Sequence, residues 1–173
     1  MVNLLPNPSV EFDSNRDEKC DGWTPSRADG LEWTKPGWGN VKVEGLYDIN
    51  LNLKDAYSEM RALKITGAQE ERVWSSEPVK LGEGSSFLAL GWIRATGPSP
   101  EAFFRVQWMD SSGKLLRSDV LWPSALTTDW REISATVKRP SGAKSVIFQC
   151  VLGKASNGTA SFDDMVFAAD RVQ

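Results

Sequence analysis

Near its C-terminus the chain reads Gly158-Thr-Ala-Ser-Phe-Asp-Asp-Met-Val-Phe167. The aromatic and β-branched residues of this stretch are typical of a buried strand, yet Asp163 and Asp164 lie in its middle. Carboxylates placed against a core need a cation or several backbone donors, because burying an unpaired charge is costly. The stretch therefore predicts a strand whose acidic pair has a specific partner.

The N-terminal stretch is the candidate for that partner. It reads Asn3-Leu-Leu-Pro-Asn-Pro-Ser-Val-Glu11, a short apolar run interrupted by Pro and Asn and ended by a single acid. We interpret the two ends of the chain as adjacent strands that share one metal ion. The competing interpretation is that Asp163 and Asp164 cap backbone amides while Glu11 is exposed.

Short strand-like segments recur along the chain, and no window has the periodicity of a convincing helix. Turns such as Asp110-Ser-Ser-Gly113 separate them, and their residues supply the backbone angles that tight turns need. Many short strands with such turns indicate an all-β antiparallel sandwich of two sheets. The expected strands are 41–44, 61–66, 79–81, 87–95, 103–109, 120–122, 130–138, 145–152 and 160–167, and 15–40 is the expected long loop.

The composition limits the size and the partners of this fold. A chain of 173 residues suits a single domain, 1–173, that buries roughly two thirds of its unfolded surface. Its net charge is −3 and its bases are dispersed, so it has no electrostatic footprint for nucleic acid or an anionic membrane. No apolar run approaches the roughly 20 residues of a membrane span, and the first residues lack a signal-peptide pattern. We expect a processed or excised domain that is monomeric.

Three residue types limit the reactions and ligands that we expect of this protein. The chain has no His, which removes the commonest general base, the usual Ser and Cys nucleophile pairs, and most zinc or copper sites. Its two cysteines, Cys20 and Cys150, allow one long-range disulfide at most, and strand alternation favours Cys150 as a small buried hydrophobe. The 8 Trp exceed what packing requires and suggest a surface that stacks against flat ligands.

Several stretches, taken in order, resemble one family of domains. They are Asn3–Glu11, Asp21–Trp23, Arg61–Ile65, Ser86–Ala95, Trp108–Gly113, Thr128–Trp130, Pro140–Val146 and Gly158–Met165. Their order and spacing resemble jelly-roll carbohydrate-binding modules of the group of families 4, 9, 16 and 22, over nearly the whole chain. The resemblance implies a jelly roll with one concave sheet. It also implies a secreted, non-catalytic module that targets an attached carbohydrate-active enzyme to its polysaccharide.

The same resemblance implies a structural Ca²⁺ where the first and last strands meet. Glu11 and Asp163 match the acidic ligands of the family, and Ser9 matches a carbonyl donor. Backbone carbonyls around Ser58 and Arg61 would complete the shell. Ca²⁺ accepts such a mixed set, because it binds roughly 6 to 8 carboxylate and carbonyl oxygens together.

The resemblance implies that the sugar lies on the concave sheet, and strand alternation predicts which side chains face it. Within 103–109 the apolar residues Phe104, Val106 and Trp108 should face the core. Arg105 and Gln107 should face the groove, and Gln149 matches a position that contacts sugar in the family. Planar side chains of this kind can bond vicinal hydroxyls in pairs.

Exposed indoles are the expected stacking platforms, because the apolar face of a sugar ring suits an electron-rich ring. Trp74 lies near the stacking position of the family, and Trp122 lies in the rim segment before Thr128–Trp130. Trp33 and Trp38, in the expected loop, are further candidates. For each of these four the alternative is ordinary packing under a loop, which is what we expect of Trp23, Trp108 and Trp130.

Two other functions stay open. Jelly rolls also host glycan hydrolases and lyases, and a glycosidase needs two carboxylates across the scissile bond. No motif places such a pair among Glu70, Glu71, Glu77 and Asp119. The third interpretation is a protein-contact or adhesion domain of a surface protein. We therefore expect a polysaccharide or oligosaccharide as partner, without indication of which one.

Overall fold

The computed structural model describes residues 2–34, 37–43, 47–52, 61–67, 69–154 and 156–169, with backbone alone for 37–43, 47–52, 98 and 99. These residues form strands, turns and loops, and none of them belongs to a helix that could span a bilayer. The strands are β1 (Trp23–Pro25), β2 (Leu31–Trp33), β3 (Gly37–Val43), β4 (Tyr47–Asn52), β5 (Leu63–Thr66), β6 (Arg72–Ser76), β7 (Val79–Lys80), β8 (Ser86–Ser99), β9 (Ala102–Met109), β10 (Leu115–Leu121), β11 (Arg131–Lys138), β12 (Ser145–Leu152) and β13 (Asn157–Ala169).

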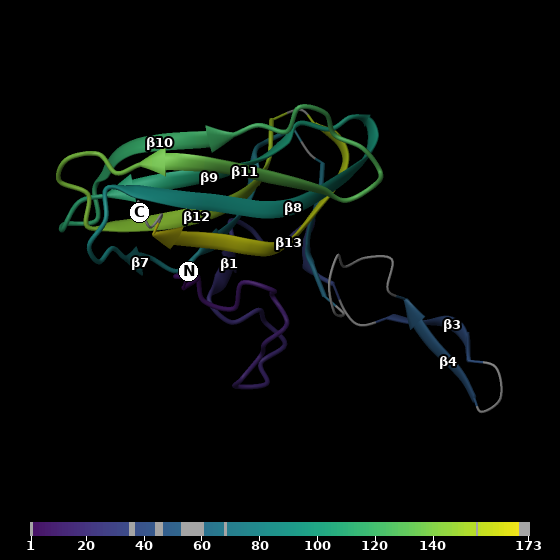
Figure 1. Cartoon of the computed structure of the whole chain (residues 1–173). Coiled ribbons are helices and arrows are strands. Elements are labelled where there is room, and N and C mark those ends of the chain that lie inside the picture. Colours follow the sequence, from purple (N-terminus) through teal and green to yellow (C-terminus); the bar gives the residue numbers. More distant parts are fainter. Residues whose placement is uncertain are drawn as a thin grey trace.

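Two antiparallel sheets pack against each other (Figure 1). Sheet A has the order β1-β6-β12-β9-β10, with β7 also paired to β12, and sheet B has the order β11-β8-β13-β5-β2. Strands β3 and β4 pair with each other in a two-stranded ribbon. The expected all-β antiparallel sandwich is confirmed.

The core lies between the two sheets, and alternation within each strand decides which side chains fill it. Phe104, Val106 and Trp108 of β9 are each 0% exposed, as expected, and so is Cys150 of β12. Rings from the two sheets meet edge to face, with the centroids of Phe104 and Phe162 5.4 Å apart. Such contacts between aromatic rings add to the stabilisation from buried apolar area.

Four strands, β1, β2, β4 and β6, were not expected from the sequence. Strands β1 and β2 lie inside the segment predicted as a long loop, and β10 begins at Leu115 rather than at residue 120. Strands of three residues are too short to show alternation, and they form because the edges of β6 and β5 offer unpaired backbone groups. Their existence depends on a neighbouring strand that is distant in sequence.

The N-terminal segment 3–11 is a loop, not the strand that we expected, although it does lie along β13. Leu4 donates its N–H to the Phe167 carbonyl at 2.8 Å, and Met165 donates its N–H to the Pro8 carbonyl at 2.9 Å. Val10, with φ of 54°, lies in the left-handed region and breaks a regular ladder. The two ends of the chain are therefore adjacent, as predicted, without a regular strand pairing.

Candidate functional site

The outer face of sheet A, the side turned away from sheet B, brings the predicted polar residues together. Gln149 of β12 is the direct cross-strand partner of Arg105 in β9, and Ile147 is the partner of Gln107. These residues alternate with core residues such as Trp108, so their side chains point outward. The expected grouping of Arg105, Gln107 and Gln149 is thus present on one face.

Arg105 is the centre of a hydrogen-bonded chain on this face. Its Nη1 and Nη2 donate to the carboxylate of Glu71 at 3.3 and 2.9 Å. Its Nε donates to Gln149 Oε1 at 2.6 Å, and Gln149 Nε2 donates to Ser75 Oγ at 2.9 Å. The chain crosses three neighbouring strands of sheet A and holds the planar groups in one orientation.

The hydrogen-bonded chain around Arg105 leaves donors and acceptors available for a ligand. A guanidinium carries five N–H donors, of which Arg105 uses three in the bonds to Glu71 and Gln149. Gln149 keeps a second amide N–H and a second acceptor position on its oxygen. The half-buried Gln107 side chain makes no hydrogen bond to any other described residue. The face can therefore bond hydroxyl groups through both donors and acceptors.

An apolar row lies next to the hydrogen-bonded chain. Val73, Val151 and Phe103 form a cluster separate from the main core, and they are 7%, 0% and 6% exposed. Val151 is the cross-strand partner of both Val73 and Phe103, so the row runs across β6, β12 and β9. The Trp122 ring packs on Phe103 with centroids 4.3 Å apart and stays 55% exposed. Trp122 thus places an open indole at the end of the row.

Trp74, in contrast, is part of the core, and the expectation that it stacks on sugar is wrong. It is 4% exposed, and its Nε1 donates to the Lys64 carbonyl of sheet B at 3.4 Å. Its cross-strand partner is the inward-facing Cys150. Alternation in β6 turns Val73 and Ser75 outward and Trp74 inward. The inward direction of Trp74 could not be predicted, because the sequence analysis did not identify β6 as a strand.

The other tryptophans mostly pack inside the sandwich or against charged side chains. Trp23 is buried, as expected. Trp33 is 9% exposed, and the Arg61 guanidinium lies 3.7 Å from its ring centroid, so it is a packing residue rather than a platform. The Arg94 guanidinium lies 5.2 Å from the Trp130 ring centroid. The side chain of Trp38 lies outside the described residues.

The residues expected to hold calcium that the structure describes belong to the N-terminal segment (Ser9 and Glu11), to the segment just before β5 (Arg61) and to β13 (Asp163). Glu11 Oε1 accepts the Arg61 N–H at 2.7 Å, so these two are neighbours. The fully buried Asp163 precedes a bulge in β13, and its Oδ1 accepts the N–H of Asp164 at 2.7 Å. That bond is the backbone capping that the competing interpretation expects. Ser58 lies outside the described residues.

The donors of these residues fit Ca²⁺ in kind, because they are carboxylate and carbonyl oxygens. The described residues contain no group of three or more His, Cys, Asp or Glu that could hold a metal ion. A cation here would therefore rely on the two carboxylates of Glu11 and Asp163 together with backbone oxygens. Ser9 and Asp164 line a pocket of about 290 Å³ beside the bulge.

Several residues of this face were missed by the sequence analysis. Glu71, Ser75 and Val73 belong to the hydrogen-bonded chain or to the apolar row. For Val73 and Ser75, the signal present in the sequence was strand alternation, which turns these two side chains outward and Trp74 between them inward. Glu71 had been considered as a possible catalytic acid.

Comparisons with known proteins agree with this architecture. No protein-family model and no curated protein sequence matches the chain. A solved family 16 carbohydrate-binding module matches with a TM-score of 0.63 and 15% identity, over 96% of this chain and 99% of that one. TmCBM61, solved with β-1,4-galactotriose, matches with a TM-score of 0.60 and 16% identity, over 98% of this chain and 100% of that one.

A larger protein contains a similar domain. The enzymatically active domain of tailspike protein 4 of bacteriophage CBA120 matches with a TM-score of 0.60 and 13% identity. The match covers 96% of this chain but only 21% of the tailspike chain. Modules of families 4 and 22 also match. The chain therefore has the jelly-roll fold of carbohydrate-binding modules, which confirms the resemblance at the level of fold.

Proposed function

We propose that this protein is a non-catalytic polysaccharide-binding module whose ligand lies in a groove on the outer face of sheet A. The observation that carries the proposal is the position of the Arg105–Gln149 chain directly beside an apolar row that ends in an exposed indole. A pyranose offers hydroxyls at its edge and C–H groups on its face. The hydrogen-bonded chain matches the hydroxyls, and the 55% exposed indole of Trp122, rather than the buried row beside it, matches the C–H groups.

The hydrogen-bonded chain supplies orientation. Arg105 and Gln149 are held by Glu71 and Ser75, so their remaining donors and acceptors have fixed directions before the ligand arrives. A pre-oriented group loses less conformational entropy on binding than a free one. Neighbouring hydroxyls of one sugar can then bond to the guanidinium and to the amide at the same time.

The stacking half of the site supplies affinity. The ring of Trp122 is 55% exposed and rests on Phe103, which limits its rotation. A sugar ring packed against it removes apolar surface from water, and a ring contact adds on the order of 1 kcal/mol. With one such stack and a few hydrogen bonds, we expect a Kd in the micromolar to millimolar range.

Two structural neighbours indicate which glycans to test first. TmCBM61 was solved with β-1,4-galactotriose, and a family 22 module of Paenibacillus barcinonensis Xyn10C is described as xylan-binding. We propose a secreted module joined to a carbohydrate-active enzyme. Binding would keep that enzyme close to its substrate and raise the effective substrate concentration.

Affinity electrophoresis tests the proposal directly. Native gels containing xylan, β-1,4-galactan, β-glucan, mannan or alginate should retard the protein with at least one polymer, and the Arg105→Ala variant should migrate faster in that gel. Free migration in all five gels would contradict the proposal.

Three of the four carboxylates considered for an enzyme are engaged in other contacts. Glu71 is bound by Arg105, and Glu70 is bound by Arg27. Asp119 accepts the Trp108 Nε1–H at 2.7 Å and an Arg117 N–H at 2.8 Å. These contacts favour binding over hydrolysis. Release of reducing sugar, or of unsaturated product absorbing in the ultraviolet, from any of the five polymers would reverse this choice.

We also propose that Ca²⁺ joins the N-terminal segment to β13 through the Glu11 and Asp163 carboxylates and backbone carbonyls near Ser9, Ser58 and Arg61. A bound cation would stabilise the folded state, because the unfolded chain lacks the site. Chelator should lower the melting temperature of the unsubstituted protein and should leave the melting temperature of Asp163→Asn unchanged. An equal melting temperature of the parent protein with chelator and with added Ca²⁺ would contradict this site.

A further inference from the structure

The line of outward side chains on β9 continues past the end of the strand. Gln107, Arg105 and Phe103 follow one another at every second residue, and Glu101 is the next member of the series. Glu101 is exposed, and its carboxylate makes no hydrogen bond or ion pair with any other described residue. The proposed glycan face therefore leads along β9 to a free carboxylate.

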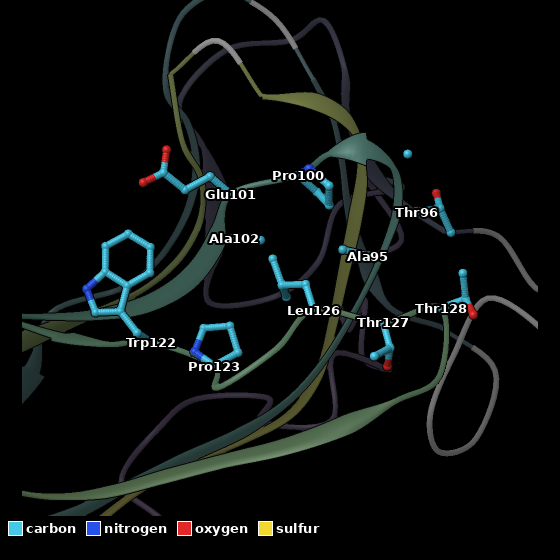
Figure 2. A pocket seen from close by; sticks show the side chains of 11 residues that line it. Ala95, Thr96, Pro100, Glu101, Ala102, Trp122, Pro123, Leu126, Thr127 and Thr128 are labelled. Atoms are coloured by element: carbon cyan, nitrogen blue, oxygen red, sulfur yellow. The ribbon is translucent and has the colours of Figure 1, made fainter.

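A pocket of about 590 Å³ opens at this end of the face (Figure 2). Its size lies within the range of roughly 300 to 1,000 Å³ that is typical of small-molecule sites. Figure 2 shows the Trp122 ring and the Glu101 carboxylate on the same side of the pocket, with Leu126, Thr127 and Thr128 across from Glu101. Trp122 thus belongs both to the apolar row and to the wall of the pocket.

The pocket is closed on its inner side by small residues of the core. Ala95 of β8 and Ala102 of β9 are 4% and 0% exposed, and both line the pocket. The segment after β10 is held over them, because the Ala95 N–H bonds to the Thr127 carbonyl at 2.9 Å. Alanine at these strand positions leaves space that a β-branched or aromatic residue would fill. A ligand that enters the pocket meets the core of the sandwich and cannot continue through it.

We propose that this pocket holds the terminal sugar of a polysaccharide whose preceding sugars lie along β9, so that the module recognises chain ends. The inference rests on the proposed function. Trp122 packs against the ring of the terminal sugar, and Glu101 accepts hydrogen bonds from two of its hydroxyls. A carboxylate suits this role because it has only acceptors, and charge-assisted hydrogen bonds are about twice as strong as neutral ones.

Gly153 positions the carboxylate of Glu101. The Gly153 N–H donates to the Glu101 carbonyl at 2.6 Å, and a Cβ atom at residue 153 would lie 2.7 Å from Glu101 Oε2. Any side chain at this position would force the carboxylate to move. Gly153→Ala therefore displaces Glu101 without changing the charge of the pocket.

The number of modules bound per chain tests the inference. The polymer from the five-gel panel that retards the protein most is cut into length fractions, and each fraction is titrated calorimetrically at equal sugar mass. If the module recognises chain ends, one module binds to each polysaccharide chain, whatever the length of that polysaccharide. If the number of modules bound rises in proportion to length, the ligand is the chain interior and the inference fails while the proposed function stands. Absence of binding to every polymer overturns both.

Three variants locate the site of end recognition. Glu101→Ala should weaken binding of a short oligosaccharide about tenfold or more, because two hydrogen bonds to a charged group are lost. Gly153→Ala should weaken it in the same direction, and Glu132→Ala, an exposed acid on β11 of sheet B, should leave it unchanged. Unchanged affinity in Glu101→Ala, in a protein that still binds and melts normally, would place the terminal sugar elsewhere.

Discussion

The planar side chains of the outer face act through geometry as much as through charge. Arg105 makes two bonds to Glu71 and one to Gln149 with a single rigid group. Its side chain is 18% exposed, whereas that of Glu71 is 41% exposed. Ion pairs this open to solvent contribute little to folding, so we infer that Arg105 serves binding more than stability.

Replacing Arg105 by Lys separates charge from geometry. Lysine keeps the charge but lacks the planar fork, so it cannot hold Glu71 and Gln149 together. We expect affinity for glycan to fall almost as far in Arg105→Lys as in Arg105→Ala, with a melting temperature close to that of the parent protein. Calorimetric titration and a melting scan measure the two effects. Full affinity in Arg105→Lys would mean that charge alone is required.

Trp122 is the second residue whose loss should affect binding alone. Removing an exposed ring that contributes on the order of 1 kcal/mol should weaken binding about fivefold or more. The matched control is Leu116→Ala, a 41% exposed apolar residue of β10, the strand that ends just before Trp122. Calorimetric titration should show weaker binding for Trp122→Ala only. Equal losses in both variants would indicate a general apolar surface rather than a stacking platform.

At the scale of the element, strands β8 and β9 fit together through a glycine. A Cβ atom on Gly91 would lie 2.5 to 3.0 Å from three ring atoms of Phe104. Such distances are too short for carbon atoms in contact, so one of the two strands or the ring would have to shift. Gly91 is needed because β8 and β9 belong to opposite sheets that press against each other here.

Gly91→Ala should lower the free energy of unfolding by about 1 to 3 kcal/mol, the usual cost of overpacking a core. Urea denaturation measures this change. Gly82→Ala is the control, because a Cβ atom there has nothing within 4 Å, and surface changes of that kind stay within about 0.5 kcal/mol. Adding Phe104→Leu to Gly91→Ala should restore part of the loss. If Gly91→Ala had the same free energy of unfolding as the unsubstituted protein, the two sheets would be able to move apart here and accommodate the added methyl group.

At the scale of the whole molecule, the ionisation of the two cysteine thiols depends on whether the sandwich is folded. Both are free thiols buried in the same hydrophobic core. Burial raises the pKa of the Cys20 thiol far above its usual range, and the nearby Asp21 carboxylate acts in the same direction. Burial also raises the pKa of Cys150, assisted by Cys20 and Asp163.

These pKa shifts make stability depend on pH in the alkaline range. The unfolded thiols ionise near pH 8.5, while the folded thiols keep their protons. The stabilisation is therefore complete below about pH 8.5 and is lost progressively as the pH rises above it. Urea denaturation at pH 8 and pH 10 should show a lower midpoint at pH 10, and the difference should shrink in Cys20→Ser. A thiol reagent should react only after unfolding.

Much of the fold could be predicted, because alternation is a property of neighbouring residues. The core positions Phe104, Val106 and Trp108 and the outward positions Arg105 and Gln107 all follow from one strand, β9. Strands β1 and β2 could not be predicted in this way, since three residues do not establish a period. The edges that they complete belong to strands far away in the sequence.

The sequence by itself determined the antiparallel sandwich, its central core and the polar members of the candidate face. Only the tertiary structure decided that Trp74 points inward, that the N-terminal segment follows β13 as a loop, and that Trp122 joins an apolar row to a pocket. The reason is physical. Local patterns specify which way a side chain points once its strand exists, whereas strand pairing and the closure of loops depend on contacts between distant residues.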